Sequence, residues 1–91
     1  MVRDLLSVRE RTFQNFLDRA KNINLDTEHK GLFERLRTNR RVKQEVFAEA
    51  LERYESHRDN YGSDSLSFLQ WLLEHFDEIL AMIQRIIALF P

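Results

Sequence analysis

Three histidines and a group of carboxylates are the side chains in this sequence with types suited to catalysis or metal binding. His29, His57 and His75 stand far apart, and no two are four residues apart as in a helical zinc site. Glu74 and Glu78 are one helical turn apart, but His75 directly follows Glu74, unlike the Glu-x-x-His spacing of di-iron bundles. No glycine-rich, phosphate-binding loop is present. We therefore predict no enzymatic activity, no metal site and no cofactor.

A cationic segment offers a different chemistry. Within residues 28–43 six Lys and Arg residues outnumber two Glu residues, in a pattern compatible with a helix-turn-helix. The following segment turns acidic, which would repel a phosphate backbone, and the arginines can equally pair with nearby acids on a solvated helix face. Nucleic-acid binding is thus the first alternative function, and its candidate residues are Arg35, Arg37, Asn39, Arg40, Arg41 and Lys43.

The composition sets bounds on the fold and the compartment. A chain of 91 residues with 43% hydrophobic and 11% aromatic residues is long enough for one core, so we predict a single domain over residues 1–91. Two glycines and one proline leave few helix breaks. The absence of cysteine fits a reducing compartment, and the first residues lack the apolar run of a signal peptide, so we expect a cytoplasmic protein.

The spacing of apolar residues predicts an all-α fold, a small bundle of three to four helices. The first helix is expected from near Asp4 or Ser7 to about Ile23, and a short second helix follows. Asn39 can cap a third helix. The last and longest helix is expected over residues 65–90.

This predicted C-terminal helix is apolar around more than half of its circumference. Its main stripe recurs every three or four residues and is expected to form the core; it comprises Leu69, Leu72, Leu73, Phe76, Ile79, Leu80, Ile83, Ile86, Ile87 and Phe90. A second line, displaced by roughly 100° on the helical wheel, mixes apolar and polar groups as interfaces do. We call it the C-terminal line, and it comprises Trp71, His75, Glu78, Met82 and Leu89.

Three surfaces can cover the C-terminal line: other helices of the same chain, a second copy or protein partner, or a lipid membrane. A bilayer span is disfavoured because Glu74, Asp77 and Glu78 lie near the middle of the helix. Peripheral membrane binding is a second alternative, weakened by the single cation, Arg85, on the polar face. The favoured prediction is a non-enzymatic protein-interaction or assembly module that self-associates or binds a partner through this helix.

Overall fold

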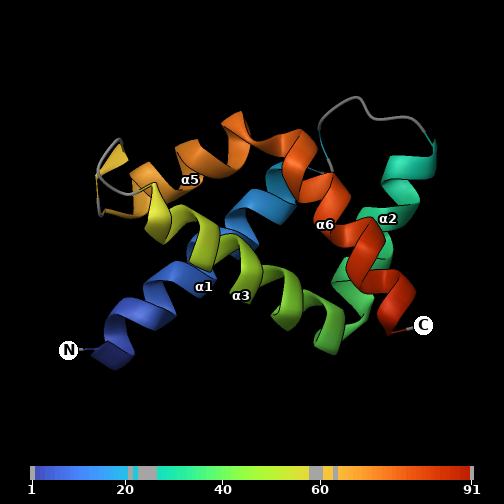
Figure 1. The fold of residues 1–91 in the computed structure, drawn as a ribbon, viewed down its shortest axis with the longest axis horizontal. Helices are drawn as coiled ribbons and strands as arrows, with labels where there is room; N and C mark the ends of the chain where they lie inside the picture. Colours follow the sequence, from blue (N-terminus) through green and yellow to red (C-terminus); the bar gives the residue numbers. More distant parts are fainter. Residues whose placement is uncertain (1, 21, 23–26, 58–60, 63, 91) are drawn as a thin grey trace.

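The described part of the chain is entirely helical apart from its connections. The computed structural model describes residues 2–20, 22, 27–57, 61–62 and 64–90, together with the side chains of these residues except 2–6 and 65. The fold measures 36 × 25 × 20 Å, with the two termini at opposite ends (Figure 1). Its helices are α1 (Val2–Ala20), α2 (Thr27–Thr38), α3 (Arg40–Ser56), α5 (Ser65–Glu74) and α6 (Phe76–Leu89). The prediction of an all-α bundle is confirmed.

The predicted single helix over residues 65–90 is wrong in one respect, because it is two helices that meet at His75. The backbone of His75 has φ −108° and ψ 34°, whereas ψ in an α-helix is about −42°. No proline or glycine lies between residues 65 and 90 to signal this break. The described residues therefore form five helices, where three to four were expected.

The end of α5 coincides with a side-chain hydrogen bond of His75, which is made in addition to the ordinary helical bond of its backbone. Its backbone N–H donates to the carbonyl oxygen of Trp71 over 2.9 Å. Its ring Nδ1 lies 2.9 Å from the same oxygen, a contact that requires the proton on Nδ1. A side chain that binds the carbonyl of the preceding turn competes with the helical pattern. His75 thus closes α5 and starts α6 without a side-chain cap.

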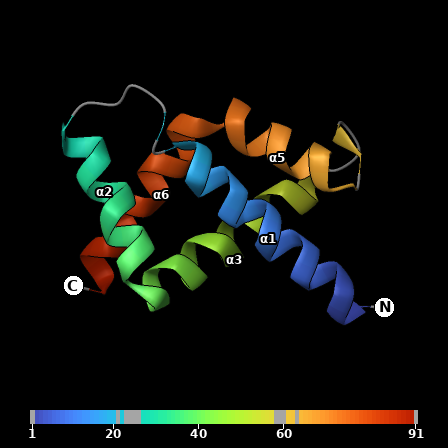
Figure 2. The ribbon, with the colours of Figure 1, turned by 180° about the vertical axis from the view of Figure 1, so that it is seen from behind.

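The break lets the two halves pack against different helices. α5 lies mainly on α1, whereas α6 lies on α3 and α2 (Figure 2). At the other end, α1 begins at Val2, before the expected start near Asp4 or Ser7, and the expected end at Ile23 lies outside the described residues. Between α2 and α3 stands only Asn39, whose side chain accepts a hydrogen bond from the Val42 N–H over 3.1 Å. The predicted cap at Asn39 is confirmed.

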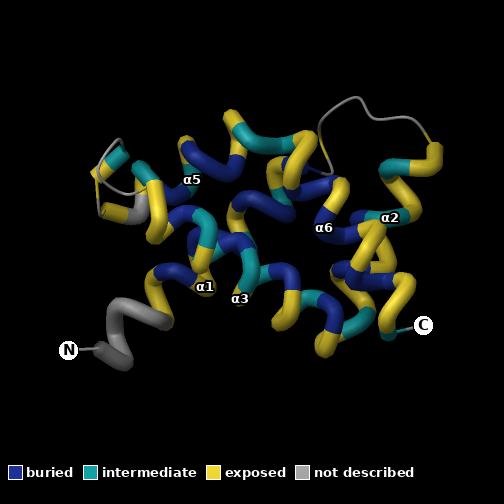
Figure 3. Tube along the Cα trace, viewed as in Figure 1, coloured by how far each residue is buried: buried dark blue, intermediate teal, exposed yellow. Residues whose placement is uncertain are grey.

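The core lies between these helices and takes side chains from all five, as the dark segments in Figure 3 show. Trp71 and Met82 are 0% and 1% exposed, so both belong to this core. Leu73, predicted as core, is 39% exposed, and Leu69, Phe76 and Phe90 are only partly buried. The remaining members of the predicted stripe are buried, and they are Leu72, Ile79, Leu80, Ile83, Ile86 and Ile87.

Aromatic rings hold the helix contacts at two places. Phe33 of α2 stacks on Phe76 of α6 with 5.6 Å between ring centroids, and Phe16 of α1 meets Phe76 edge-on at 5.9 Å. At the other end, Tyr54 of α3 lies 5.0 Å from Phe68 and 6.1 Å from Trp71, both of α5. Ring pairs at these separations add to the gain from burial.

A buried arginine joins the second aromatic group to α1. The side chain of Arg9 is 3% exposed, and its guanidinium carbon lies 4.9 Å from the Tyr54 ring centroid and 5.5 Å from that of Phe68. The same guanidinium donates to the backbone oxygen of Asp64 over 3.4 Å and lies 3.9 Å from a Glu55 carboxylate oxygen. Aromatic faces and acceptors thus compensate for the water that this cation loses on burial.

Because Trp71 is buried, its truncation should unfold the protein more readily. We expect Trp71→Ala to lower the free energy of unfolding by about 3–5 kcal/mol through cavity formation. Leu89→Ala, at a side chain that is 66% exposed, serves as the control and should change it by less than about 0.5 kcal/mol. Urea titration followed by far-UV circular dichroism measures both. Equal losses in the two variants would contradict the burial of Trp71.

Candidate functional site

The structure divides the five residues of the C-terminal line. Trp71 and Met82 are covered by other helices of the same chain, which was the intramolecular alternative for this line. Leu89 is 66% exposed and Glu78 is exposed, while His75 is half-buried. Trp71 and Met82 are therefore unavailable to a partner in the folded chain. The residues left at the surface do not form an uninterrupted apolar strip.

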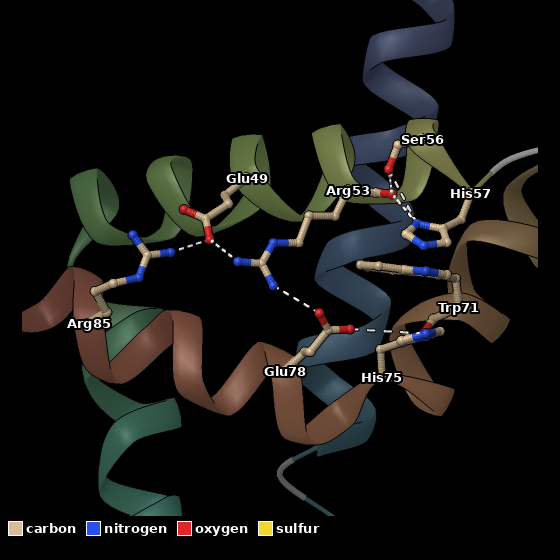
Figure 4. Close-up of polar contacts among 8 residues, drawn as sticks. All are labelled: Glu49, Arg53, Ser56, His57, Trp71, His75, Glu78 and Arg85. Carbon is tan, nitrogen blue, oxygen red and sulfur yellow. Dashed lines mark hydrogen bonds and ion pairs between the residues drawn. The ribbon is translucent and has the colours of Figure 1, made fainter.

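Glu78 and His75 take part in a chain of polar contacts that joins α3 to α6 (Figure 4). Arg53 of α3 lies between two carboxylates, 2.9 Å from Glu78 of α6 and 3.1 Å from Glu49 of its own helix. Arg85 of α6 contacts the same Glu49 oxygen as Arg53 does. His75 Nε2 lies 4.0 Å from the other oxygen of Glu78. These pairs are partly exposed, so they fix the contact between α3 and α6 more than they add stability.

His75 is also surrounded by rings. Its imidazole stacks on Trp71 with 4.7 Å between centroids and meets Tyr61 edge-on at 6.2 Å. His57 approaches to 6.4 Å, and its Nδ1 lies 2.9 Å from the backbone oxygen of Arg53. Figure 4 shows both imidazoles beside the Trp71 indole. The three histidines are far apart in the sequence, but the fold brings His57 and His75 together.

This histidine pair does not extend to a metal site. In the residues the structure describes, no group of three His, Cys, Asp or Glu side chains could hold a metal ion. Tyr61 donates to Glu74 over 3.4 Å, and its pKa is raised above the usual tyrosine value by desolvation and, secondarily, by the charge of Glu74. That shift disfavours the phenolate, the form a catalytic base would need. The absence of enzymatic activity stays a prediction.

The basic segment does not form one surface. Arg37 pairs with Glu34 over 3.2 Å, and the Asn39 side chain is used as the cap of α3. The guanidinium of Arg41 lies 4.7 Å from the Phe90 ring centroid, whereas Arg40 and Lys43 face a groove beside α1. Arg35 is exposed on α2. The single residue between α2 and α3 also differs from the turn of three to four residues in a helix-turn-helix. Nucleic-acid binding through this segment stays a prediction.

An apolar face that the sequence analysis missed lies on α5. Leu66 and Leu73 are 73% and 39% exposed, and Leu69 between them is partly buried. These three residues, which we call the α5 leucine face, are spaced for one side of a helix. Leu66 was not recognised because it lies outside the predicted stripe, and Leu73 was placed in the core. The apolar spacing predicts one unbroken helix over residues 65–90. It therefore does not show that α5 and α6 bury different sides.

Polar residues of α1 border the α5 leucine face. A shallow groove of about 420 Å³ runs between the two helices, lined by Leu66 and Leu69 and by Asn15, Asp18, Arg19 and Asn22. Val8 is 41% exposed and shares the helical face of Asn15 and Arg19 by its spacing. An apolar strip with a polar rim of both charges is the composition of many protein interfaces.

No family model matches this chain. No curated protein and no solved structure is significantly similar to it either. The function is therefore argued from the surfaces of the chain itself. Among the described residues, no helix is both long and apolar enough to cross a lipid bilayer. Peripheral membrane binding stays a prediction.

The start of α5, which carries Leu66, is fixed by Asp64. Its carboxylate accepts a hydrogen bond from the Ser67 N–H over 2.7 Å. That hydrogen bond is the main reason why the pKa of Asp64 lies below the usual carboxyl value, and the positive charge of Arg9 lowers it further. Stabilisation by this cap is complete above the pKa of the unfolded chain and is lost as the pH falls through the lower pKa of the folded chain.

Replacement of Asp64 should therefore change how stability depends on pH. Asp64→Asn keeps a capping side chain but cannot ionise, so we expect its stability deficit to be largest near neutral pH and to vanish at acidic pH. Asp64→Ala removes the cap as well and should be less stable than wild type throughout. Urea midpoints measured across the acidic range test this. Parallel pH profiles of wild type and Asp64→Asn would contradict it.

Proposed function

We propose that this protein is a non-enzymatic interaction module that self-associates through the α5 leucine face. The observation that carries the proposal is the exposure of Leu66 and Leu73 on one side of α5, next to the partly buried Leu69. The prediction of an interaction through the C-terminal region is retained, but its position moves from the C-terminal line to the first half of that region. A contiguous exposed apolar face is unusual for a surface that stays in water.

The charged residues that border the α5 leucine face favour a second copy of this chain as its binding partner. In a twofold dimer the same patch meets itself, so its charges must be complementary to their own arrangement. Asp18 and Arg19 are adjacent on α1, at the edge of the face. The carboxylate of one copy can thus approach the guanidinium of the other, which a rim of one charge would prevent. A small domain also gains stability from oligomerisation.

The polar contacts of the C-terminal line favour α5 over α6 as the interface. Glu78 is occupied by Arg53, and His75 by its contacts to Trp71. Leu89 is exposed and is the last residue of α6, and the C-terminal end of that helix lies away from α5 in both views (Figures 1 and 2). One isolated leucine is ordinary on a protein surface, whereas Leu66 and Leu73 lie on the same side of α5 with the partly buried Leu69 between them.

A charge on the α5 leucine face should abolish self-association. We expect wild type to form dimers at micromolar concentration and Leu66→Glu to weaken the dimer about a hundredfold, because each lost leucine contact occurs twice and each 1.4 kcal/mol is a factor of ten. Sedimentation equilibrium at several concentrations measures the dissociation constants.

Leu89→Glu is the matched control, since it places the same charge at a leucine of similar exposure on α6. It should leave the dimer within about twofold of wild type. A wild type that remains monomeric at 100 μM would contradict self-association. Loss of the dimer in Leu89→Glu but not in Leu66→Glu would move the interface to α6.

A further inference from the structure

A second groove, between α1 and α3, combines cations with an aromatic surface. It has a volume of about 480 Å³, within the usual range for small-molecule sites. Arg11 of α1 and Arg40 and Lys43 of α3 line it, although α1 and α3 are far apart in the sequence. We call it the α1–α3 groove. Arg40 and Lys43 belong to the basic segment, and only the fold brings Arg11 to them.

The three cations are not neutralised within the described part of the chain. None of them forms an ion pair with a described carboxylate, and Glu10 is the single acid among the residues lining the groove. Lys43 donates instead to the amide oxygen of Gln14, which holds its ammonium group at the groove. By contrast, Arg53 and Arg85 both use Glu49 on another side of α3. A net excess of two positive charges favours a ligand with at least two negative charges.

The apolar wall of the groove is aromatic. Phe13 and Phe47 lie with 5.4 Å between ring centroids and an interplanar angle of 53°. Phe13 is 1% exposed and belongs to the core, whereas Phe47 is partly buried and offers its ring to the groove. Stacking on a phenylalanine suits any flat heteroaromatic ring and depends little on which ring it is.

We propose that the α1–α3 groove binds a nucleoside diphosphate. The base lies against Phe47, and the diphosphate lies among Arg11, Arg40 and Lys43. Arginine forks suit phosphate oxygens, and the lysine ammonium adds a third positive charge. This groove adjoins the proposed dimer face, since Gln14 donates to Asp18 over 3.2 Å, but the two grooves share no lining residue.

Isothermal titration calorimetry with three probes tests the two parts of the proposed site. ADP carries both the base and the diphosphate, adenosine carries only the base, and pyrophosphate carries only the charge. We expect ADP to bind at least tenfold more tightly than either of the others. No binding of ADP at millimolar concentration, or equal affinity for pyrophosphate, would overturn the proposal.

Matched charge variants test the position of the site. Arg40→Gln should weaken ADP binding at least tenfold, whereas Arg35→Gln, which removes the same charge from the exposed face of α2, should change it by less than twofold. Phe47→Leu should weaken ADP binding severalfold and leave pyrophosphate binding unchanged. Circular dichroism confirms that each variant is folded. Equal losses in Arg35→Gln and Arg40→Gln would overturn the proposal.

Two further measurements separate this site from the other functions. Leu66→Glu should retain the ADP affinity of wild type even when it is monomeric, so failure of the dimer and failure of the groove are distinguishable. A single-stranded oligonucleotide should bind no more tightly than ADP does. If it binds far more tightly and loses affinity equally in Arg35→Gln and Arg40→Gln, the basic segment binds nucleic acid and the proposal is overturned.

Discussion

The non-helical backbone at His75 sets which helices the last third of the chain packs against, because it separates α5 from α6. Both the backbone nitrogen and Nδ1 of His75 lie 2.9 Å from the Trp71 carbonyl oxygen, and the helical path changes direction there. If residues 65–90 formed one straight helix, their apolar side chains would all be arranged around a single helix axis. The change of direction lets α5 cover α1 while α6 packs between α2 and α3. Trp71 and Met82 are buried on opposite sides of the bend as a result.

The sequence was informative wherever a pattern is repeated along a helix. The helical class, the cap at Asn39 and most of the core stripe followed from apolar spacing and from local hydrogen-bonding preferences. The break at His75 did not, because histidine has no strong tendency to end helices and no proline or glycine lies near it. One unrecognised bend was enough to misassign Leu73.

The candidate sites were less predictable than the fold, because each is built from helices distant in the sequence. Arg40 and Lys43 were singled out as cations, but their proximity to Arg11 depends on how α1 crosses α3. Likewise, the net charge of −1 does not show that the charged residues on the two sides of α3 have different roles. Glu49 on one side of α3 binds arginines that secure α6, while the groove side keeps its cations for a ligand or solvent.

The burial of Arg9 has a consequence for the order of folding. Its partners, the Tyr54 ring and the backbone oxygen of Asp64, lie some 45 and 55 residues further along the chain. During synthesis the apolar face of α1 with Phe13, Phe16 and Leu17 can meet Phe33 of α2 early, but it is fully covered only after α3 and α5 have been made. Contacts of this separation slow folding because a long loop must close first. Helices α2, α3 and α6 contact one another more extensively than they contact α1, so they can assemble first and receive α1 together with α5.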